Sequence, residues 1–208
     1  MRSAAPRPRL LLLLCSALAG IGGGTARGQD PDPQERAAVL RAMVILKIAP
    51  YLAPEPKPAP RAPAPTPPKA GEQAPGPTYR IGLCGHDDVS AAAAKHLPQK
   101  RVGDAAVATV AVTAASAAAP RGDEPRPYDL LYIAADTPHD VVARIVAAHA
   151  NEPVPLVCEQ RGFAARGGGV QLFVQDNTLR FEVNVDALKQ QGVRASPQLL
   201  KLSKEAPK

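Results

Sequence analysis

Three residues that can do chemistry stand close together after the first predicted core strand: Cys84, His86 and Asp87. A Cys–His pair can act as a nucleophile and its base, and all three residue types bind zinc. Such a pair at the C-terminal end of a strand would lie at the ligand-binding edge of an α/β fold. However, two-residue spacing predicts that Cys84 and His86 point in different directions, and the sequence has no second Cys/His cluster. We therefore predict no catalytic residue, no metal ligand and no cofactor. An enzyme or a metal- or small-ligand-binding protein that uses these three residues is the alternative.

Two cysteines, Cys84 and Cys158, remain once the predicted export signal is removed. Both stand at the C-terminal end of a predicted strand, and in a parallel sheet such ends lie at one edge. Export permits disulfides, and a bridge requires that the two strands lie close together. The residues therefore allow a Cys84–Cys158 disulfide and, equally, two buried free thiols.

A glycine-rich crossing at 162–169 is the candidate binding loop. Three consecutive glycines cannot form the interior of a strand or a helix at low cost, so they predict a turn into the next strand. The alternative is a backbone nest for an anion, supported by two arginines. The segment matches neither the phosphate-loop pattern nor the dinucleotide fingerprint, which favours the turn. The candidate residues are Arg161, Gly162, Phe163, Arg166, Gly167, Gly168 and Gly169.

The elements that must position these residues alternate between strands and helices. Apolar residues at every second position predict two strands, 170–175 and 178–185, joined by a turn at Asp176–Asn177 that tolerates positive φ. The predicted fold is a single α/β domain: a mixed, mostly parallel sheet flanked by helices, with a C-terminal antiparallel hairpin. The other predicted strands are 79–85, 105–113, 129–135 and 154–158, and the predicted helices are 34–52, 89–96 and 137–150.

The closing segment predicts one more short helix. Ser196 is placed as its N-cap and Pro197 at its first position. So short a helix needs tertiary contacts, which predicts that Leu199, Leu200 and Leu202 dock on the sheet. The alternative is that these leucines form an exposed patch for a partner.

The N-terminus has the parts of a secretory signal: early arginines, an apolar run that begins at Leu10, and small residues before a predicted cleavage after Ala26. Cleavage removes three of the 25 basic residues and none of the 19 acidic ones, which lowers the net charge from +6 to +3. The sequence has no basic cluster interleaved with aromatic residues, so it does not predict nucleic-acid binding. No later stretch is long enough to span a bilayer. We expect a periplasmic or secreted protein.

The predicted organisation has four parts. Residues 1–26 are the signal peptide, 27–52 the N-terminal helix of the domain and 78–204 its α/β part. Between them, residues 53–77 are rich in proline and alanine. That composition favours extended polyproline II and predicts a disordered insertion instead of a packed core.

The C-terminal third resembles the YfiR-like family of exported bacterial proteins. The resemblance rests on the Gly162–Phe163 step, the glycines before the strand at 170, the Arg180-Phe181-Glu182-Val183-Asn184 strand and the closing segment 196–202. The strands at 79–85 and 129–133 and the helix at 34–52 are similar to earlier family elements.

The resemblance implies a non-enzymatic regulator. The best-known members bind the periplasmic part of a membrane diguanylate cyclase and hold it inactive, which lowers cyclic-di-GMP. A cyclase or sensor kinase is therefore the implied partner, and some members form homodimers with disulfides. The sequence departs from the pattern in its proline-rich insertion. It also has Tyr128 where some members have a cysteine, which weighs against a multi-disulfide switch.

Overall fold

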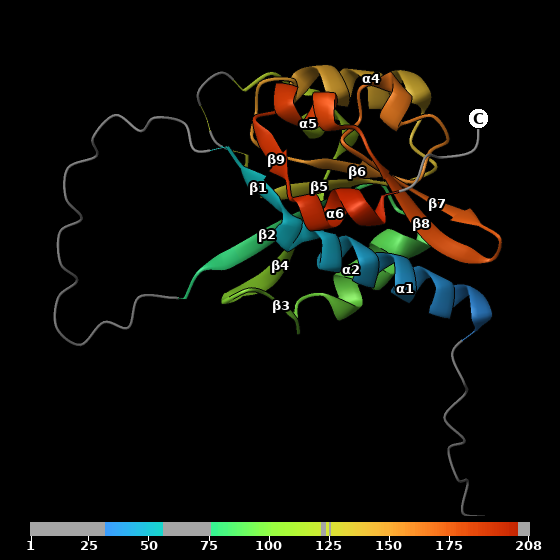
Figure 1. Ribbon diagram of the computed structural model, residues 1–208. Coiled ribbons are helices and arrows are strands. Elements are labelled where there is room, and N and C mark those ends of the chain that lie inside the picture. Colours follow the sequence, from blue (N-terminus) through green and yellow to red (C-terminus); the bar gives the residue numbers. More distant parts are fainter. Residues whose placement is uncertain (1–31, 56–75, 122–123, 125, 204–208) are drawn as a thin grey trace, which may run out of the picture. The chain divides into compact units, whose positions relative to one another are not determined.

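The computed structural model describes residues 32–55, 76–121, 124 and 126–203. Seven strands form one sheet in the order β3-β4-β2-β5-β6-β7-β8, and two short strands, β1 and β9, form a separate antiparallel pair (Figure 1). The strands are β1 (Leu52–Pro54), β2 (Thr78–Cys84), β3 (Arg101–Val102), β4 (Ala105–Val112), β5 (Leu130–Ile133), β6 (Leu156–Cys158), β7 (Val170–Gln175), β8 (Thr178–Val183) and β9 (Val193–Ala195).

The sheet is mixed and mostly parallel, as predicted. Strands β4, β2, β5, β6 and β7 run parallel, while β3 and β8 are antiparallel to their neighbours at the two edges. Among the described residues, no helix is both long enough and apolar enough to cross a bilayer. The helices are α1 (Pro33–Ile48), α2 (Asp88–His96), α3 (Ala114–Ala118), α4 (His139–Ala148), α5 (Val185–Gln190) and α6 (Pro197–Leu202), with single 3-10 turns at Ala49–Tyr51 and Ala164–Arg166.

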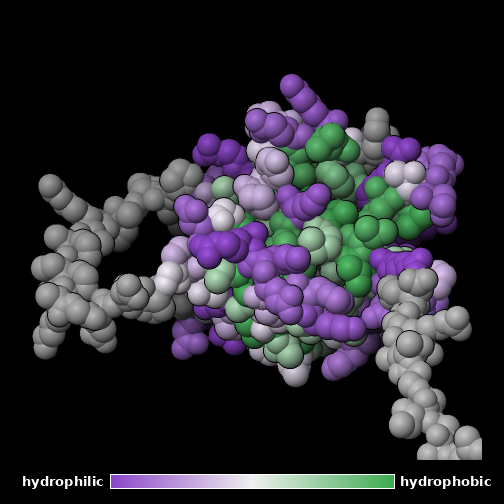
Figure 2. Space-filling model, turned by 90° about the horizontal axis from the view of Figure 1, so that it is seen from below, coloured by the Kyte–Doolittle hydropathy of each residue, from purple (hydrophilic) through white to green (hydrophobic). Residues whose placement is uncertain are grey.

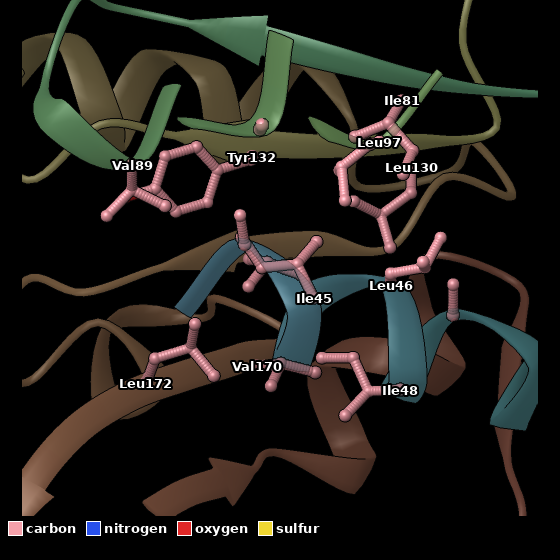
Figure 3. Close-up of a cluster of buried hydrophobic side chains, with 14 of the residues drawn as sticks. Ile45, Leu46, Ile48, Ile81, Val89, Leu97, Leu130, Tyr132, Val170 and Leu172 are labelled. Carbon is pink, nitrogen blue, oxygen red and sulfur yellow. The ribbon is translucent and has the colours of Figure 1, made fainter. Parts of the chain in front are cut away.

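Helices cover both faces of the sheet, and each face has its own hydrophobic cluster. Helices α1, α2 and α6 contribute to the first cluster, and α3 and α4 to the second. Figure 3 shows Ile45 of α1 between Tyr132 on one side and Val170 and Leu172 on the other. Strands buried on both faces are typical of parallel sheets with helical connections.

The opening helix begins one residue before its predicted start and ends four residues before its predicted end. The side chain of Asp32 accepts a hydrogen bond from the Gln34 amide at 3.4 Å, and Pro33 takes the first helical position. Pro50 has no amide hydrogen to continue the helix. Leu52, predicted as helical, instead pairs with Ala195 in the β1–β9 ladder.

Strand β1 also includes Ala53 and Pro54, which the sequence assigned to the disordered insertion. These two residues are therefore not part of a disordered segment, contrary to the predicted boundary. The rest of the proline-rich tract, 56–75, lies outside the described residues, as does the predicted signal peptide.

The C-terminal hairpin forms as predicted. Asp176 and Asn177 have φ angles of 50° and 55°. The residues on either side of them, Gln175 and Thr178, pair with each other across the hairpin. Strand β8 ends at Val183, two residues early, because the side chain of Asn184 caps α5 through the Ala187 amide at 2.9 Å. Gln171, predicted to face away from the apolar row, is 1% exposed.

The expected docking of the closing leucines is correct for one of three. Ser196 caps α6 through the Leu199 amide at 3.2 Å, and Leu199 is buried. Leu200 is 37% exposed and Leu202 is 67% exposed. Leu202 is the last residue of α6, and it lies at the surface although it shares a helix face with Leu199.

Candidate functional site

Asp87, at the carboxyl edge of the parallel strands, is bound by three donors of its own domain. One carboxylate oxygen accepts the Ser90 amide at 2.8 Å and so caps α2. The other accepts the Tyr132 hydroxyl at 2.8 Å and the Ala135 amide at 3.0 Å. Asp87 thus joins the ends of β2 and β5 to the start of α2, which is a structural role.

Cys84 and His86 do not form a nucleophile–base pair. Cys84 is fully buried, while His86 is exposed at the surface. Burial raises the pKa of the Cys84 thiol, and the nearby Asp136 carboxylate raises it further. Reactive cysteines need a lowered pKa. Within the described ranges, no group of three or more His, Cys, Asp or Glu side chains could hold a metal ion.

The cysteines themselves are buried free thiols. Strand β5 runs between their strands, and both Cys84 and Cys158 align with Ile133 of β5. This agrees with the second sequence interpretation and not with a disulfide, because a bridge would have to reach across an intervening strand.

Glu159, directly after β6, is a carboxylate with a side chain only 15% exposed, and sequence analysis did not single it out. One of its oxygens lies 3.5 Å from Nε of Arg41 on α1, and the other has no hydrogen-bond partner among the described residues. Burial raises the pKa of Glu159 to about 6, which Arg41 opposes and Asp87 reinforces. The pair ties α1 to the carboxyl edge of the sheet.

The glycine-rich loop uses its backbone donors internally. The amide of Phe163 donates to the Gln160 carbonyl at 3.1 Å, and that of Gly168 donates to the Phe163 carbonyl at 3.0 Å. The Ala164 amide donates to the side chain of Gln171, which explains why this glutamine is buried. The amides of Arg166 and Gly167 are bonded within the loop as well. These donors are not available to a bound anion, so the geometry favours the turn.

Glycine is needed in this loop for space and for backbone conformation. A Cβ atom on Gly168 would lie 2.2 Å from the buried ring of Phe163, and Gly167 has a φ of 88°. Arg166 reaches back to the Arg161 carbonyl at 2.9 Å and to the side chain of Gln160 at 3.3 Å. Gln160 and Gln171 hold this loop in place, and sequence analysis missed both because most of their partners are backbone groups. Binding by the loop stays a prediction.

An apolar groove opens where α1, α6 and the β3–β4 turn meet. It encloses about 530 Å³, and its walls include the exposed side chains of Tyr51 and Leu202. Its charged lining residues are Lys47 and Arg101. Figure 2, which looks at the molecule from the side of α1 and β3, shows apolar side chains exposed among polar ones on this face. The groove also includes Met43, Val44, Phe181 and Leu199.

Fold and geometry together define an α/β domain whose polar strand-end residues are engaged in its own hydrogen bonds and whose apolar groove is open to solvent. Residues 66–204 match the family described as DUF4154, YfiR/HmsC-like. The match covers more than half of the chain, so the protein belongs to this family. No curated protein matches the chain. Helix α1 and strand β1 lie before the matched residues.

Proposed function

We propose that this protein is an exported regulatory binding protein that holds the periplasmic part of a membrane diguanylate cyclase inactive. It carries out no reaction of its own and acts by covering a surface of its partner. Membership of the YfiR/HmsC-like family supports this role, because the family is known for periplasmic regulators of diguanylate cyclases.

The apolar groove between α1, α6 and the β3–β4 turn carries the proposal. Exposed apolar patches of this kind mark interaction surfaces. Burying the exposed side chains of Leu202 and Tyr51 against a partner would be favourable. Lys47 and Arg101 give the rim positive charge. The occupant is therefore a segment of the cyclase with apolar side chains flanked by acidic ones. Complementary charge of this kind steers association and sets specificity.

The test uses the purified exported chain and the purified periplasmic segment of a membrane diguanylate cyclase from the same genome. We expect binding by titration calorimetry and lower cellular cyclic-di-GMP when the protein is co-expressed with the intact cyclase. Leu202→Glu should abolish both effects. Leu40→Glu is the matched control, because Leu40 is 64% exposed on α1 and does not line the groove.

A charge variant tests the rim separately. Lys47→Glu should weaken binding and reduce its dependence on salt, while Lys201→Glu, on the exposed side of α6, should not. If the wild-type protein binds none of the cyclases of that genome and leaves cyclic-di-GMP unchanged, the proposal is wrong. If Leu202→Glu and Leu40→Glu behave alike, the groove is not the binding surface.

A further inference from the structure

Strand β4 is exposed along most of one side. Its inner side pairs with β2 without interruption from Ala106 to Val112, whereas on its outer side β3 pairs only with Ala105 and Ala106. Residues 108–112 include no charged residue and no proline, which commonly protect an edge from further pairing. The outer edge of β4 is therefore open to an added strand.

Two backbone hydrogen bonds show which groups of β4 face outward. The Ala106 amide donates at 2.9 Å to the carbonyl that precedes β2, and the Val107 amide donates at 3.2 Å to the Lys100 carbonyl on the outer side. Successive residues of a strand point their backbone groups in opposite directions, so Thr109 and Ala111 turn their N–H and C=O groups outward. In the part of the chain that the structure describes, no backbone group pairs with these outward groups.

A cavity of about 310 Å³ lies beside this open edge, between the end of β4 and helix α2. Its walls include Ala91, Ala94 and Ala111, whose small side chains are exposed. Ser90 also lines the cavity. This residue is only 6% exposed, and its hydroxyl has no hydrogen-bond partner among the described residues. A buried hydroxyl without a partner is costly, so the cavity favours a group that forms a hydrogen bond with it.

We propose that β4 and this cavity bind an extended segment of another protein, which adds a strand beside Thr109 and Ala111 and places a tyrosine in the cavity. In such complexes, main-chain hydrogen bonds to the sheet edge give affinity, and a pocket for an alternate side chain gives specificity. Tyrosine fits because its ring would pack against the alanines while its hydroxyl meets that of Ser90. The proposal does not depend on the function proposed above, because the apolar groove is lined by different residues.

Lys100 determines the charge expected at the other end of the segment. It is exposed and, through its bond to Val107, marks the point where the open edge begins. Ala111, beside the cavity, is four residues further along β4 than Val107. Paired strands advance by the same rise per residue, so the segment should have an acidic side chain about four residues from its tyrosine. Complementary charge of this kind steers association.

Two acetylated and amidated peptides serve as the probe. Each has a glutamate and a tyrosine four residues apart among threonines and serines, in opposite orders for the two possible strand directions. Titration calorimetry with the exported chain should show that one of them binds. Ala94→Leu, which fills the cavity from an exposed position, should abolish this binding. Ala143→Leu, at an exposed position of α4, is the matched control and should leave it unchanged.

Two further variants test the two side-chain contacts separately. Ser90→Ala should weaken binding of the tyrosine peptide by about tenfold and leave that of its phenylalanine version unchanged, since only the tyrosine loses a hydrogen bond. Lys100→Glu should weaken binding more at low salt than at high salt, whereas Lys201→Glu on α6 should have no effect.

N-methylation of the peptide tests strand pairing without any change to the protein. Methyl groups on the amides that face β4 should abolish binding, and those on the alternate amides should not. Binding that is indifferent to their position would mean that the cavity takes a phenol without an added strand, which overturns the proposal. Failure of both peptides to bind does so as well, as does unaltered binding by Ala94→Leu. If no peptide binds and Ala94→Leu lowers the sedimenting mass of the chain alone, a second copy covers this edge instead.

Discussion

Cys84 and Cys158 flank the same residue, Ile133, from the two neighbouring strands of β5. Adjacent strands are about 4.8 Å apart, which places the two cysteine Cα atoms roughly 10 Å from each other. Disulfides join Cα atoms that are about 4.4–6.8 Å apart. The two thiols are therefore held apart by the sheet itself.

We predict that the exported protein contains two unreactive thiols and no internal disulfide. Burial raises the pKa of Cys158 to about 12 and also raises that of Cys84, so little thiolate is present at neutral pH. Iodoacetamide should label neither residue in the native state and both in denaturant, as read by mass spectrometry. A mass two hydrogens lower, with no labelling in denaturant, would contradict this.

Glu159 should make the protein less stable as the pH rises. Its pKa is about 6 in the folded state against 4.5 as the ordinary value, so the folded protein holds the proton more tightly than the unfolded chain. The resulting stabilisation is fully present below about pH 4.5 and is lost as the pH rises through 6, a change of about 2 kcal/mol.

Urea denaturation of Glu159→Gln at several pH values measures this effect. The variant should lose that part of the pH dependence and match or exceed wild-type stability at pH 7.5. Glu35→Gln, an exposed glutamate on α1 that contacts Lys95, is the control and should change stability by less than about 0.5 kcal/mol. An unchanged pH profile in Glu159→Gln would sink the idea.

Substitution of Arg126 should be among the most destabilising changes in this protein. Its side chain is 2% exposed, forms a two-pronged ion pair with Glu152 and donates to the backbone of α3 and α4. Arg126→Ala leaves a partly buried carboxylate without its partner, so we expect a loss of about 3–5 kcal/mol in the free energy of unfolding. Arg144→Ala, which breaks an exposed pair with Asp140, should cost less than about 0.5 kcal/mol. Similar denaturant midpoints for the two variants would refute this ranking.

The closing helix should depend on one leucine. Leu199 is 2% exposed, so Leu199→Ala should cost about 2–5 kcal/mol. Leu202→Ala should change the unfolding free energy by less than about 0.5 kcal/mol, because that side chain already lies in solvent. Thermal and urea unfolding of the two variants side by side check this, and equal losses would show that α6 packs differently.

The sequence predicted the parts of the fold that local patterns encode. Alternation and the Asp176–Asn177 turn predicted the hairpin, and Ser196 and Pro197 predicted the start of α6, because strand period, turn and cap chemistry act over a few residues. The β1–β9 pair was missed, since Leu52 and Ala195 are far apart in sequence and each strand has only three residues.

The candidate site was harder to predict because it depends on contacts between distant elements. Asp87 was selected as a reactive group, yet three donors from separate segments make it structural. Glu159 was overlooked because only Arg41 and its burial give it significance. The leucines of α6 were treated alike, since a segment this short has no periodicity that separates its buried face from its exposed one.

Helix α1 and strand β1 lie before the residues that match the family, yet Ala42, Ile45 and Leu52 are part of the main core. They are held to the sheet by packing and by the β1–β9 ladder, independently of the covalent connection through 56–75. The protein is therefore a natural candidate for splitting: a protease cut within 56–75 should yield two polypeptides that migrate together in native gels and separate only in denaturant. Residues 66–204 produced alone should bind hydrophobic dyes, and adding the fragment that contains 32–55 should reverse this.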